Sequence, residues 1–285
     1  MYIGNYDCQE WREDWNKESY LCTSQYSPWF YPTLRNLKII QGEGKNPTKI
    51  LESKYPKTLD APSGGNNWKY SLGEDFEELY VSFKVKFGED FIDNRGGKLH
   101  GFCGEECYTG GINGDNGWSS RTTFADGRGI YFYIYYPGKD GVYGDSCTNP
   151  GSEDLCWMDI TNGEELFEFI PGVWYTFTHR IVMNEPGVEN GIIEGFIDGK
   201  LVSQRTNAYL RGEGKSYGID KFYFCTFFGG SRGCEDYNDE DCDAPNKKDE
   251  YIYFDDFVIF DYKEGISVAR GNIPWNSKQK LISPF

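Results

Sequence analysis

Hydrophobic and polar residues alternate along many short segments of this chain, a pattern typical of half-buried β-strands. The clearest case is residues 79–87, where Val81, Phe83, Val85 and Phe87 are expected to face a core while the residues between them face outward. Turn-forming glycine and proline separate these segments, and the sequence contains neither an internal repeat nor a long amphipathic helix. About ten such strands predict an all-β sandwich of two antiparallel sheets.

The same alternation predicts strands elsewhere and places one histidine in the core. In residues 174–183, His179 shares a face with apolar residues, so we expect it to be buried and hydrogen-bonded. Arg180 lies on the opposite side, where a surface role and a contact with a ligand are both open. Asp198-Gly199 is a strong two-residue turn signal and predicts a hairpin. The other expected strands are residues 37–42, 222–228 and 251–262.

Three further segments carry polar side chains on the face opposite their hydrophobic one. They are residues 96–101 (GGKLHG), 118–124 (WSSRTTF) and 129–138 (GIYFYIYYPG). Because side chains alternate along a strand, the polar faces can be read directly from these runs. They hold Lys98, His100, Ser119, Arg121, Thr123, Tyr131, Tyr133 and Tyr135. If the three strands pair in one sheet, these groups form a single polar patch.

Cations beside phenols suit the removal of a proton next to a carboxylate. β-Elimination across the glycosidic bond of a uronic acid requires a cation to neutralise the carboxylate, a base for the C5 proton and an acid for the leaving oxygen. Arg121 can hold a carboxylate through two parallel hydrogen bonds. A tyrosine beside cations loses its proton more easily than a free phenol. A lone Tyr-x-Tyr usually indicates only strand-forming aromatic surface, but its combination with Lys98 and Arg121 favours the catalytic interpretation.

These motifs resemble those of the alginate and glucuronan lyases of polysaccharide lyase family 14, which are β-jelly-rolls. The family pattern has a lysine in a Gly-Gly-Lys-Leu-Pro-Gly loop, a Ser-x-Arg strand and a Tyr-x-Tyr strand. The matching residues here are Lys98, Ser119, Arg121, Tyr133 and Tyr135, and His100 stands where the family usually has proline. Further similar segments begin at Asn184, Phe196, Thr226 and Tyr253, so the likeness covers roughly residues 65–262.

The resemblance implies a polysaccharide lyase in which Arg121 and Lys98 hold the substrate carboxylate and Ser119 orients it. Tyr133 and Tyr135 would act as base and acid, and the sequence does not say which of the two takes which role. Lys98 is itself a candidate base if neighbouring cations lower its pKa, and His100 is a second candidate base. No metal or other cofactor is required by this scheme. The additional substrate-binding candidates are His100, Tyr131, Arg95 and Arg180.

Two other functions stay open at this point. A glycoside hydrolase acting on a β-glucan would use paired carboxylates, and Glu105, Glu106, Asp115 and Asp126 lie near the patch in sequence. A non-catalytic carbohydrate-binding module would use the tyrosines as stacking platforms. The sequence has no Glu-x-Asp-x-Glu strand, which disfavours the commonest hydrolase pattern on such a sandwich.

The charge of the chain excludes one class of partner and constrains another. With 29 Lys and Arg against 45 Asp and Glu, the net charge is −16, so nucleic acid is not an expected partner. The same charge repels a polyanionic substrate and fits a neutral glucan better. A lyase must therefore gather its cations at the site while acids face outward. The cations available near the patch in sequence are Arg95, Lys98, Arg121 and Arg128.

Nine cysteines predict four local disulfides and one buried thiol, Cys225, which lies in an apolar strand. Such a framework implies secretion, and because no hydrophobic leader is present we expect a signal segment to have been removed. A zinc site is disfavoured, since the spacings lack a paired Cys-x-x-Cys and the chain has only two histidines. The expected pairs are Cys8/Cys22, Cys103/Cys107, Cys147/Cys156 and Cys234/Cys242.

The length of 285 residues fits one all-β domain. We expect residues 1–36 to form an extension packed on it and residues 263–285 to form a tail. No stretch approaches the ~20 apolar residues of a membrane span. The acidic stretch 234–245 is a candidate for Ca²⁺, but it lacks the EF-hand spacing, so a disulfide-closed loop is favoured. The overall expectation is a secreted monomer that acts on a polysaccharide.

Overall fold

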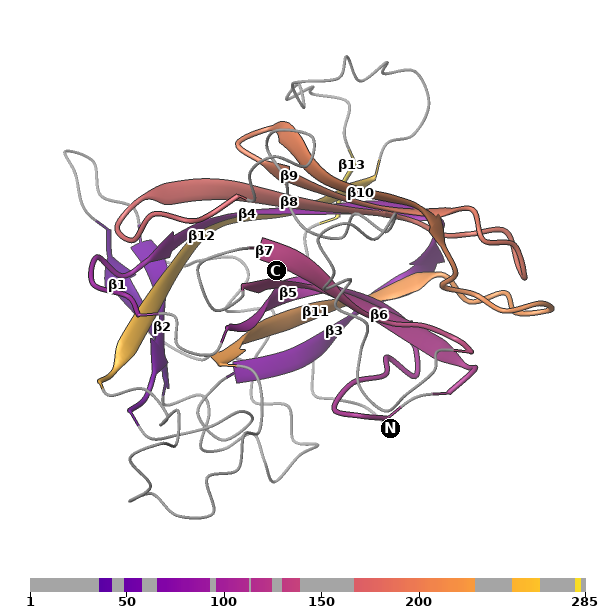
Figure 1. The fold of residues 1–285 in the computed structure, drawn as a ribbon, viewed down its shortest axis with the longest axis horizontal. Helices are drawn as coiled ribbons and strands as arrows, with labels where there is room; N and C mark the ends of the chain where they lie inside the picture. Colours follow the sequence, from indigo (N-terminus) through magenta and orange to yellow (C-terminus); the bar gives the residue numbers. More distant parts are fainter. Residues whose placement is uncertain are drawn as a thin grey trace.

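Two antiparallel β-sheets face each other in this protein (Figure 1). The computed structural model describes residues 36–42, 49–57, 66–92, 96–112, 114–124, 130–138, 167–228, 248–261 and 280–282. Within these ranges thirteen strands are present, and no helix is long and apolar enough to cross a membrane. The predicted all-β sandwich is confirmed.

The larger sheet has eight strands. They are β1 (Leu37–Gln41), β2 (Lys49–Tyr55), β4 (Glu78–Phe87), β8 (Trp174–Val182), β9 (Gly191–Ile197), β10 (Lys200–Ala208), β12 (Glu250–Asp261) and β13 (Lys280–Ile282). Their order across the sheet is β1-β2-β12-β4-β8-β9-β10, and β13 pairs with β12. The hairpin between β9 and β10 turns at Asp198 and Gly199, as predicted. Both residues have positive φ, 50° and 79°, which a tight hairpin turn of this kind requires.

The smaller sheet has five strands, and it carries the polar patch predicted from the sequence. Its strands are β3 (Asn66–Phe76), β5 (Gly97–Glu105), β6 (Gly117–Phe124), β7 (Ile130–Tyr135) and β11 (Ile219–Phe228). They lie in the order β3-β11-β5-β6-β7, so three strands that are consecutive in sequence sit side by side at one end of the sheet.

The core between the sheets is built largely from phenylalanine. Val81, Phe83, Val85 and Phe87 of β4 are fully buried there, as the alternation predicted. Phe87 stacks on Phe169 with ring centroids 3.6 Å apart. Each buried aromatic ring removes a large apolar area from water, so this interior contributes strongly to the stability of the sandwich.

His179 of β8 is buried in the core and hydrogen-bonded, as expected. Its Nε2 atom lies 3.1 Å from the hydroxyl of Ser120 on the opposite sheet, and its ring stacks on Phe132 at 4.3 Å. Burial lowers the pKa of His179 to about 3, so the ring is neutral at ordinary pH. His179 therefore acts as a polar link between the two sheets.

The expectation that His100 shares the face of Lys98 is wrong. Between Lys98 and Gly101 the register of β5 against β6 shifts, because three steps along β5 match two steps along β6. Such a bulge turns the inserted residue to the other side of the sheet. Both Leu99 and His100 consequently lie in the core, where the His100 ring centroid is 4.1 Å from that of Phe224. Burial holds the pKa of His100 well below its ordinary value.

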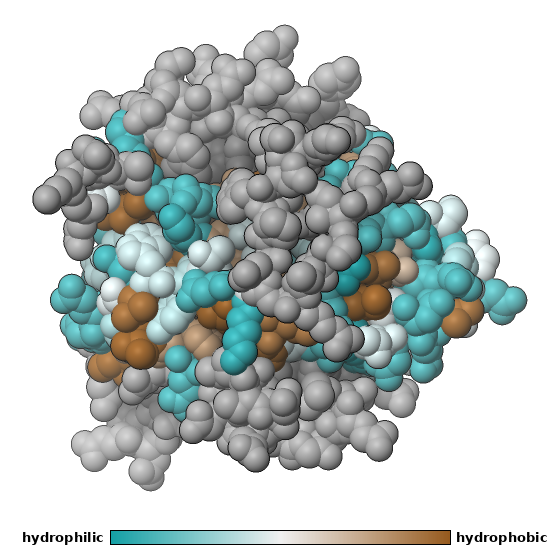
Figure 2. Space-filling model, turned by 90° about the horizontal axis from the view of Figure 1, so that it is seen from above, coloured by the Kyte–Doolittle hydropathy of each residue, from teal (hydrophilic) through white to brown (hydrophobic). Residues whose placement is uncertain are grey.

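Arg180 lies on the outer face of the larger sheet. Of the two roles that the sequence left open, a surface role and a contact with a ligand, its position supports the surface role. Its guanidinium pairs with Glu78 at 2.8 Å and with Glu194 at 2.7 Å. The neighbouring His179 and Ile181 point into the core, so Arg180 faces away from the smaller sheet. Arg180 is thus not part of the polar patch. Figure 2, which looks down from the top of Figure 1, shows hydrophilic and hydrophobic residues intermixed on the described surface.

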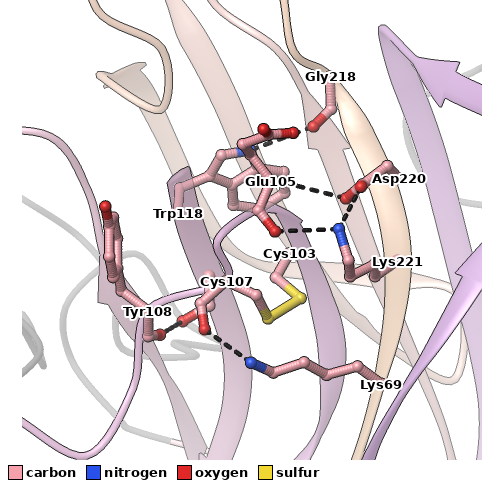
Figure 3. The surroundings of a disulfide bond; sticks show 10 residues. Lys69, Cys103, Glu105, Cys107, Tyr108, Trp118, Gly218, Asp220 and Lys221 are labelled. Atoms are coloured by element: carbon pink, nitrogen blue, oxygen red, sulfur yellow. Dashed lines mark hydrogen bonds and ion pairs between the residues drawn. A yellow bond between two sulfur atoms is a disulfide. The ribbon is translucent and has the colours of Figure 1, made fainter. Parts of the chain in front are cut away.

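The predicted disulfide between Cys103 and Cys107 is present (Figure 3). Cys225 is a free and buried thiol, also as predicted. The other three expected pairs, residues 1–35 of the extension, the acidic stretch 234–245, and residues 263–279 and 283–285 of the tail lie outside the described residues.

Asn184 is a buried hydrogen-bonding centre in the connection after β8. Its amide nitrogen donates to the carbonyls of Glu185, Val188 and Arg211, at 2.8, 3.0 and 2.7 Å. Its amide oxygen accepts from the backbone N–H groups of Leu210 and Arg211, both at 2.8 Å. One side chain therefore binds five backbone groups, of which the carbonyls of Val188 and Arg211 also accept from the N–H groups of Asn190 and Gly187.

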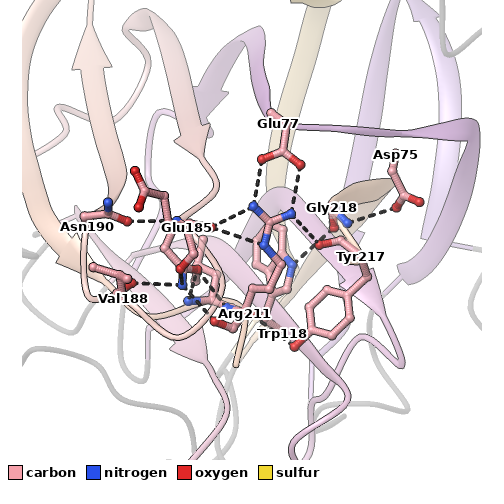
Figure 4. Close-up of polar contacts among 11 residues, drawn as sticks. Asp75, Glu77, Trp118, Glu185, Val188, Asn190, Arg211, Tyr217 and Gly218 are labelled. Carbon is pink, nitrogen blue, oxygen red and sulfur yellow. Dashed lines mark hydrogen bonds and ion pairs between the residues drawn. The ribbon is translucent and has the colours of Figure 1, made fainter. Parts of the chain in front are cut away.

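Arg211 continues this network across the sandwich. It is 5% exposed, and its two terminal nitrogens donate to both carboxylate oxygens of Glu77 at 2.8 Å (Figure 4). It also donates to the carbonyls of Asn184 and Tyr217. Arg211 is thus fully neutralised by a structural partner, which distinguishes it from the arginine described below.

We predict that Asn184→Ala lowers the free energy of unfolding by about 3 kcal/mol or more, because a buried backbone group left unpaired costs ~1–3 kcal/mol. Urea unfolding followed by circular dichroism measures the change. Asn190→Ala is the matched control. Asn190 accepts one bond from the N–H of Glu185 at the exposed edge of the same turn, so its loss should cost less than about 1 kcal/mol. Equal costs for the two variants would contradict the role given to Asn184.

Candidate functional site

The central strands of the smaller sheet bring the predicted polar patch together on the face turned away from the core. β6 pairs with β7 without a register shift, so their polar residues lie directly opposite one another. The partners are Ser119 with Tyr135, Arg121 with Tyr133, and Thr123 with Tyr131. On the other side of β6, Lys98 of β5 lies opposite Thr123. The alternate residues Trp118, Phe124 and Phe132 belong to the core, as expected.

Lys98 and Tyr133 are in direct contact. The ammonium nitrogen of Lys98 lies 4.1 Å from the centroid of the Tyr133 ring, and the Lys98 side chain is half-buried. Burial and then the nearby positive charge of Arg121 lower the pKa of Lys98 to about 7. A substantial fraction of Lys98 is therefore an uncharged amine near neutral pH, which is the form that can accept a proton.

Arg121 is a buried cation surrounded by phenol rings. It is 2% exposed, and its guanidinium carbon lies 5.5, 6.0 and 5.1 Å from the ring centroids of Tyr133, Tyr135 and Tyr223. None of the carboxylates in the described ranges forms an ion pair with it, and its Nε atom is buried without a hydrogen-bond partner. A buried charge without a counterion is costly. This arrangement therefore favours an anion as the missing partner.

Tyr133 and Tyr135 form an edge-to-face pair with ring centroids 5.6 Å apart. Tyr135 is 1% exposed, and its phenol oxygen accepts a hydrogen bond from the backbone N–H of Gly111 at 3.1 Å. Tyr133 and Tyr131 are half-buried. The phenols thus extend from a fixed, buried position at Tyr135 toward the solvent-accessible side of the patch.

Two site neighbours on β11, Tyr223 and Cys225, were not identified from the sequence. Burial raises the pKa of Tyr223 to about 12 and that of Cys225 to about 11. Both therefore stay uncharged near neutral pH and do not neutralise Arg121. Their strand reads as an apolar run, and only the pairing of β11 with β5 shows that its alternate residues line the patch.

Ser119 lies in the patch, but its hydroxyl is already engaged. The side chain is fully buried, and its hydroxyl donates to the carbonyl of Tyr108 at 2.6 Å. Ser119 thus supports the segment above it rather than presenting a free donor. Thr123 is the opposite case, since its hydroxyl is buried, faces the same side and has no hydrogen-bond partner.

The remaining candidates among the described residues do not join this cluster. Arg95, Arg128 and Asp126 lie outside the described residues. Glu105, Glu106 and Asp115, the carboxylates considered for a hydrolase, are all exposed. Asp115 accepts a hydrogen bond from the N–H of Gly138 at 3.2 Å.

Comparisons with known proteins identify the family and the fold of this chain. The family model described as Polysaccharide lyase 14 matches residues 45–257, whereas a comparison with curated proteins gave no match. Among solved structures, alginate lyase vAL-1 from Chlorella virus is 19% identical, with a TM-score of 0.60 over 79% of this chain and 90% of that chain. The marine PL-14 alginate lyase from Aplysia kurodai is 20% identical, with a TM-score of 0.61 over 79% and 87%.

A third similar structure is alginate lyase Aly36B, solved as a mutant in complex with an alginate tetrasaccharide. It is 24% identical, with a TM-score of 0.60 over 74% of this chain and 80% of that chain. These likenesses establish the β-jelly-roll fold. The family model covers most of the chain, including every strand from β2 through β11. This protein therefore belongs to polysaccharide lyase family 14 and is a polysaccharide lyase.

Proposed function

We propose that this enzyme cleaves a polyuronate, alginate or glucuronan, by β-elimination at the cluster of Lys98, Arg121, Tyr133 and Tyr135. The observation that carries the proposal is the buried guanidinium of Arg121, which has no carboxylate partner within the described part of the chain. The carboxylate of a uronic acid would supply that partner and would be held by paired hydrogen bonds. A neutral glucan would leave the buried charge uncompensated.

The chemistry follows from the contacts around this anchor. The carboxylate held by Arg121 spreads the negative charge that develops at C5 as its proton leaves. Uncharged Lys98, with a pKa of about 7, is the base that accepts the proton. The C5–H electrons form a C4=C5 double bond while the C4–O bond breaks, and a tyrosine hydroxyl gives its proton to the leaving oxygen.

Tyr133 and Tyr135 are the two candidates for this acid. Tyr133 touches Lys98 and Tyr135 alike, so the base and both phenols form one contiguous group. The proton that Lys98 gains can therefore return through the phenols after the product leaves. The cycle consumes no water, because the C4–O bond breaks by elimination, and it requires no metal, because the cations of the chain neutralise the substrate carboxylate.

We also propose that the enzyme is secreted and acts as a monomer without a cofactor. The disulfide between Cys103 and Cys107 supports an oxidising compartment. A sedimentation experiment and a metal-chelation assay test the monomer and the absence of a required metal.

The proposed substrate class can be tested with a panel of polyuronates and neutral glucans. We expect ultraviolet absorbance to rise only with a polyuronate, because the C4=C5 double bond forms only by elimination. New reducing ends on a neutral glucan without that absorbance would indicate a hydrolase instead. Binding without either signal would indicate a non-catalytic module.

Removal of the proposed base or acid should lower turnover sharply. We expect Lys98→Met and Tyr135→Phe each to reduce kcat by at least about 100-fold, the usual contribution of a general acid or base. Lys84→Met is the control, since Lys84 is exposed on the larger sheet and pairs with Asp256. Absorbance assays give the rates and circular dichroism checks the fold. Near-normal rates for both Lys98→Met and Tyr135→Phe would refute the assignment.

The lowered pKa of Lys98 also predicts how stability depends on pH. Above pH 7 the folded protein releases this proton, whereas the unfolded chain holds it up to the ordinary lysine value of 10.5. The unfolded state then binds more protons, so the contribution of Lys98 to stability rises with pH in this interval. Urea unfolding at pH 7 and pH 9 measures this change. Between these two pH values the free energy of unfolding should increase more for the wild type than for Lys98→Met. Equal increases would show that Lys98 keeps an ordinary pKa.

The unpartnered hydroxyl of Thr123 provides a separate test. Thr123→Val keeps the shape and removes only the hydroxyl, so stability should not fall. We expect kcat/KM to drop about tenfold, the effect of one lost hydrogen bond to substrate. Thr122→Val, on the core face of the same strand, should leave kcat/KM unchanged. If Thr123→Val retained full kcat/KM, the hydroxyl would have no part in recognition.

A further inference from the structure

Residues 104–112, which we name the strap, leave the end of β5 beside the site. The disulfide closes the first turn, and Glu105 and Cys107 in that turn both have positive φ, 53° and 50°. This backbone conformation is unfavourable for residues other than glycine. The turn therefore depends on the groups that hold it.

Two lysines and one aspartate hold the same turn from neighbouring strands (Figure 3). Lys69 of β3 donates to the carbonyl of Cys107 at 3.0 Å, and Lys221 of β11 donates to the carbonyl of Glu105 at 3.0 Å. The backbone N–H of Glu105 donates to Asp220 at 3.1 Å. The start of the strap is thus fixed to the sheet by one covalent bond and three hydrogen bonds.

The rest of the strap is bonded to the site itself. The carbonyl of Tyr108 accepts from the hydroxyl of Ser119 at 2.6 Å, and the N–H of Gly111 donates to the phenol oxygen of Tyr135 at 3.1 Å. Gly111 supplies the hydrogen bond to the Tyr135 oxygen. In contrast, neither Lys98 nor Arg121 is hydrogen-bonded to the strap in the described structure.

We propose that the Cys103–Cys107 disulfide, acting through the strap, is a positioning element for Tyr135, so that full catalytic rate requires the oxidised pair. The inference rests on the proposed function, in which Tyr135 takes part in proton transfer. A displacement of about 1 Å of a reacting group can cost ~100-fold in rate. The disulfide spans only four residues, so its effect on global stability is small compared with that of a long closed loop.

The proposal predicts that loss of the disulfide lowers the turnover rate and leaves substrate binding nearly unchanged. Loss of the disulfide removes the covalent anchor of the strap and loosens the donor to Tyr135, whereas Arg121 and Lys98, which are not hydrogen-bonded to the strap, keep their places. We therefore expect Cys103→Ala/Cys107→Ala to lower kcat by at least about tenfold while KM changes by less than about threefold. A purely structural disulfide would lower the unfolding midpoint and leave kcat of the folded enzyme unchanged.

The experiment compares wild type and this double variant on the polyuronate, each with and without the reductant tris(2-carboxyethyl)phosphine. We expect the reductant to lower kcat of the wild type to that of the double variant and to leave the variant unaffected. The variant retains every other cysteine, so it controls for their reduction. Ser119→Ala, which removes the next anchor of the strap without touching a cysteine, should show the same fall in kcat at unchanged KM.

Full kcat in the folded double variant, or in Ser119→Ala if the double variant does not fold, would overturn the inference. Failure of the proposed function has a different signature. The oxidised wild-type enzyme would then produce no unsaturated uronide at all, whereas failure of the inference leaves an active enzyme that is indifferent to reductant.

Discussion

The buried guanidinium of Arg121 is the constraint around which the site is organised. Three phenol rings and a neutral thiol surround it, and each contributes attraction without contributing a full negative charge. Arg211 shows the alternative, since its buried guanidinium is closed by both oxygens of Glu77. Arg211 is thus paired with a carboxylate of the chain, whereas no described carboxylate pairs with Arg121, an arrangement that suits an anion from outside. Burial, and then the positive charge of Arg121, lowers the pKa of Lys98 to about 7, so that part of it is an uncharged amine near neutral pH.

This local arrangement resolves the conflict between an acidic protein and an acidic substrate. The net charge of −16 is spread over the whole chain, but described carboxylates such as Glu77, Glu78 and Glu194 are paired with arginines away from the patch. A screened surface charge acts weakly over distances beyond about 10 Å. A buried cation acts more strongly than this on a group in contact with it, because the effective dielectric inside the protein is lower than that of water.

The alternation of side chains predicted the fold and much of the site. It was correct for β6 and β7, because these strands pair without a register shift and Arg121 therefore faces the tyrosines. It failed for His100, because a one-residue bulge in β5 leaves no trace in the hydrophobic pattern and moves the ring into the core.

Tertiary contacts account for what the sequence did not reveal. The carbonyl that engages Ser119 comes from the strap, and the pairing that brings Tyr223 and Cys225 beside Arg121 joins strands more than 100 residues apart. The lowered pKa of Lys98 likewise depends on burial by neighbours that periodicity does not identify. Residue types and their spacing thus predicted which side chains gather on one face of the sheet, whereas their protonation and exact positions depend on the packed structure.

The most direct test of this account is a comparison of one polyuronate with the same polymer after chemical reduction of its carboxyl groups to alcohols. Binding to the Lys98→Met variant is measured by calorimetry, so that no cleavage intervenes. If Arg121 binds the substrate carboxylate, the native polymer binds and the reduced polymer does not. The additional substitution Arg121→Met in the same variant then abolishes this difference in binding. Equal binding of the two polymers would contradict the central claim.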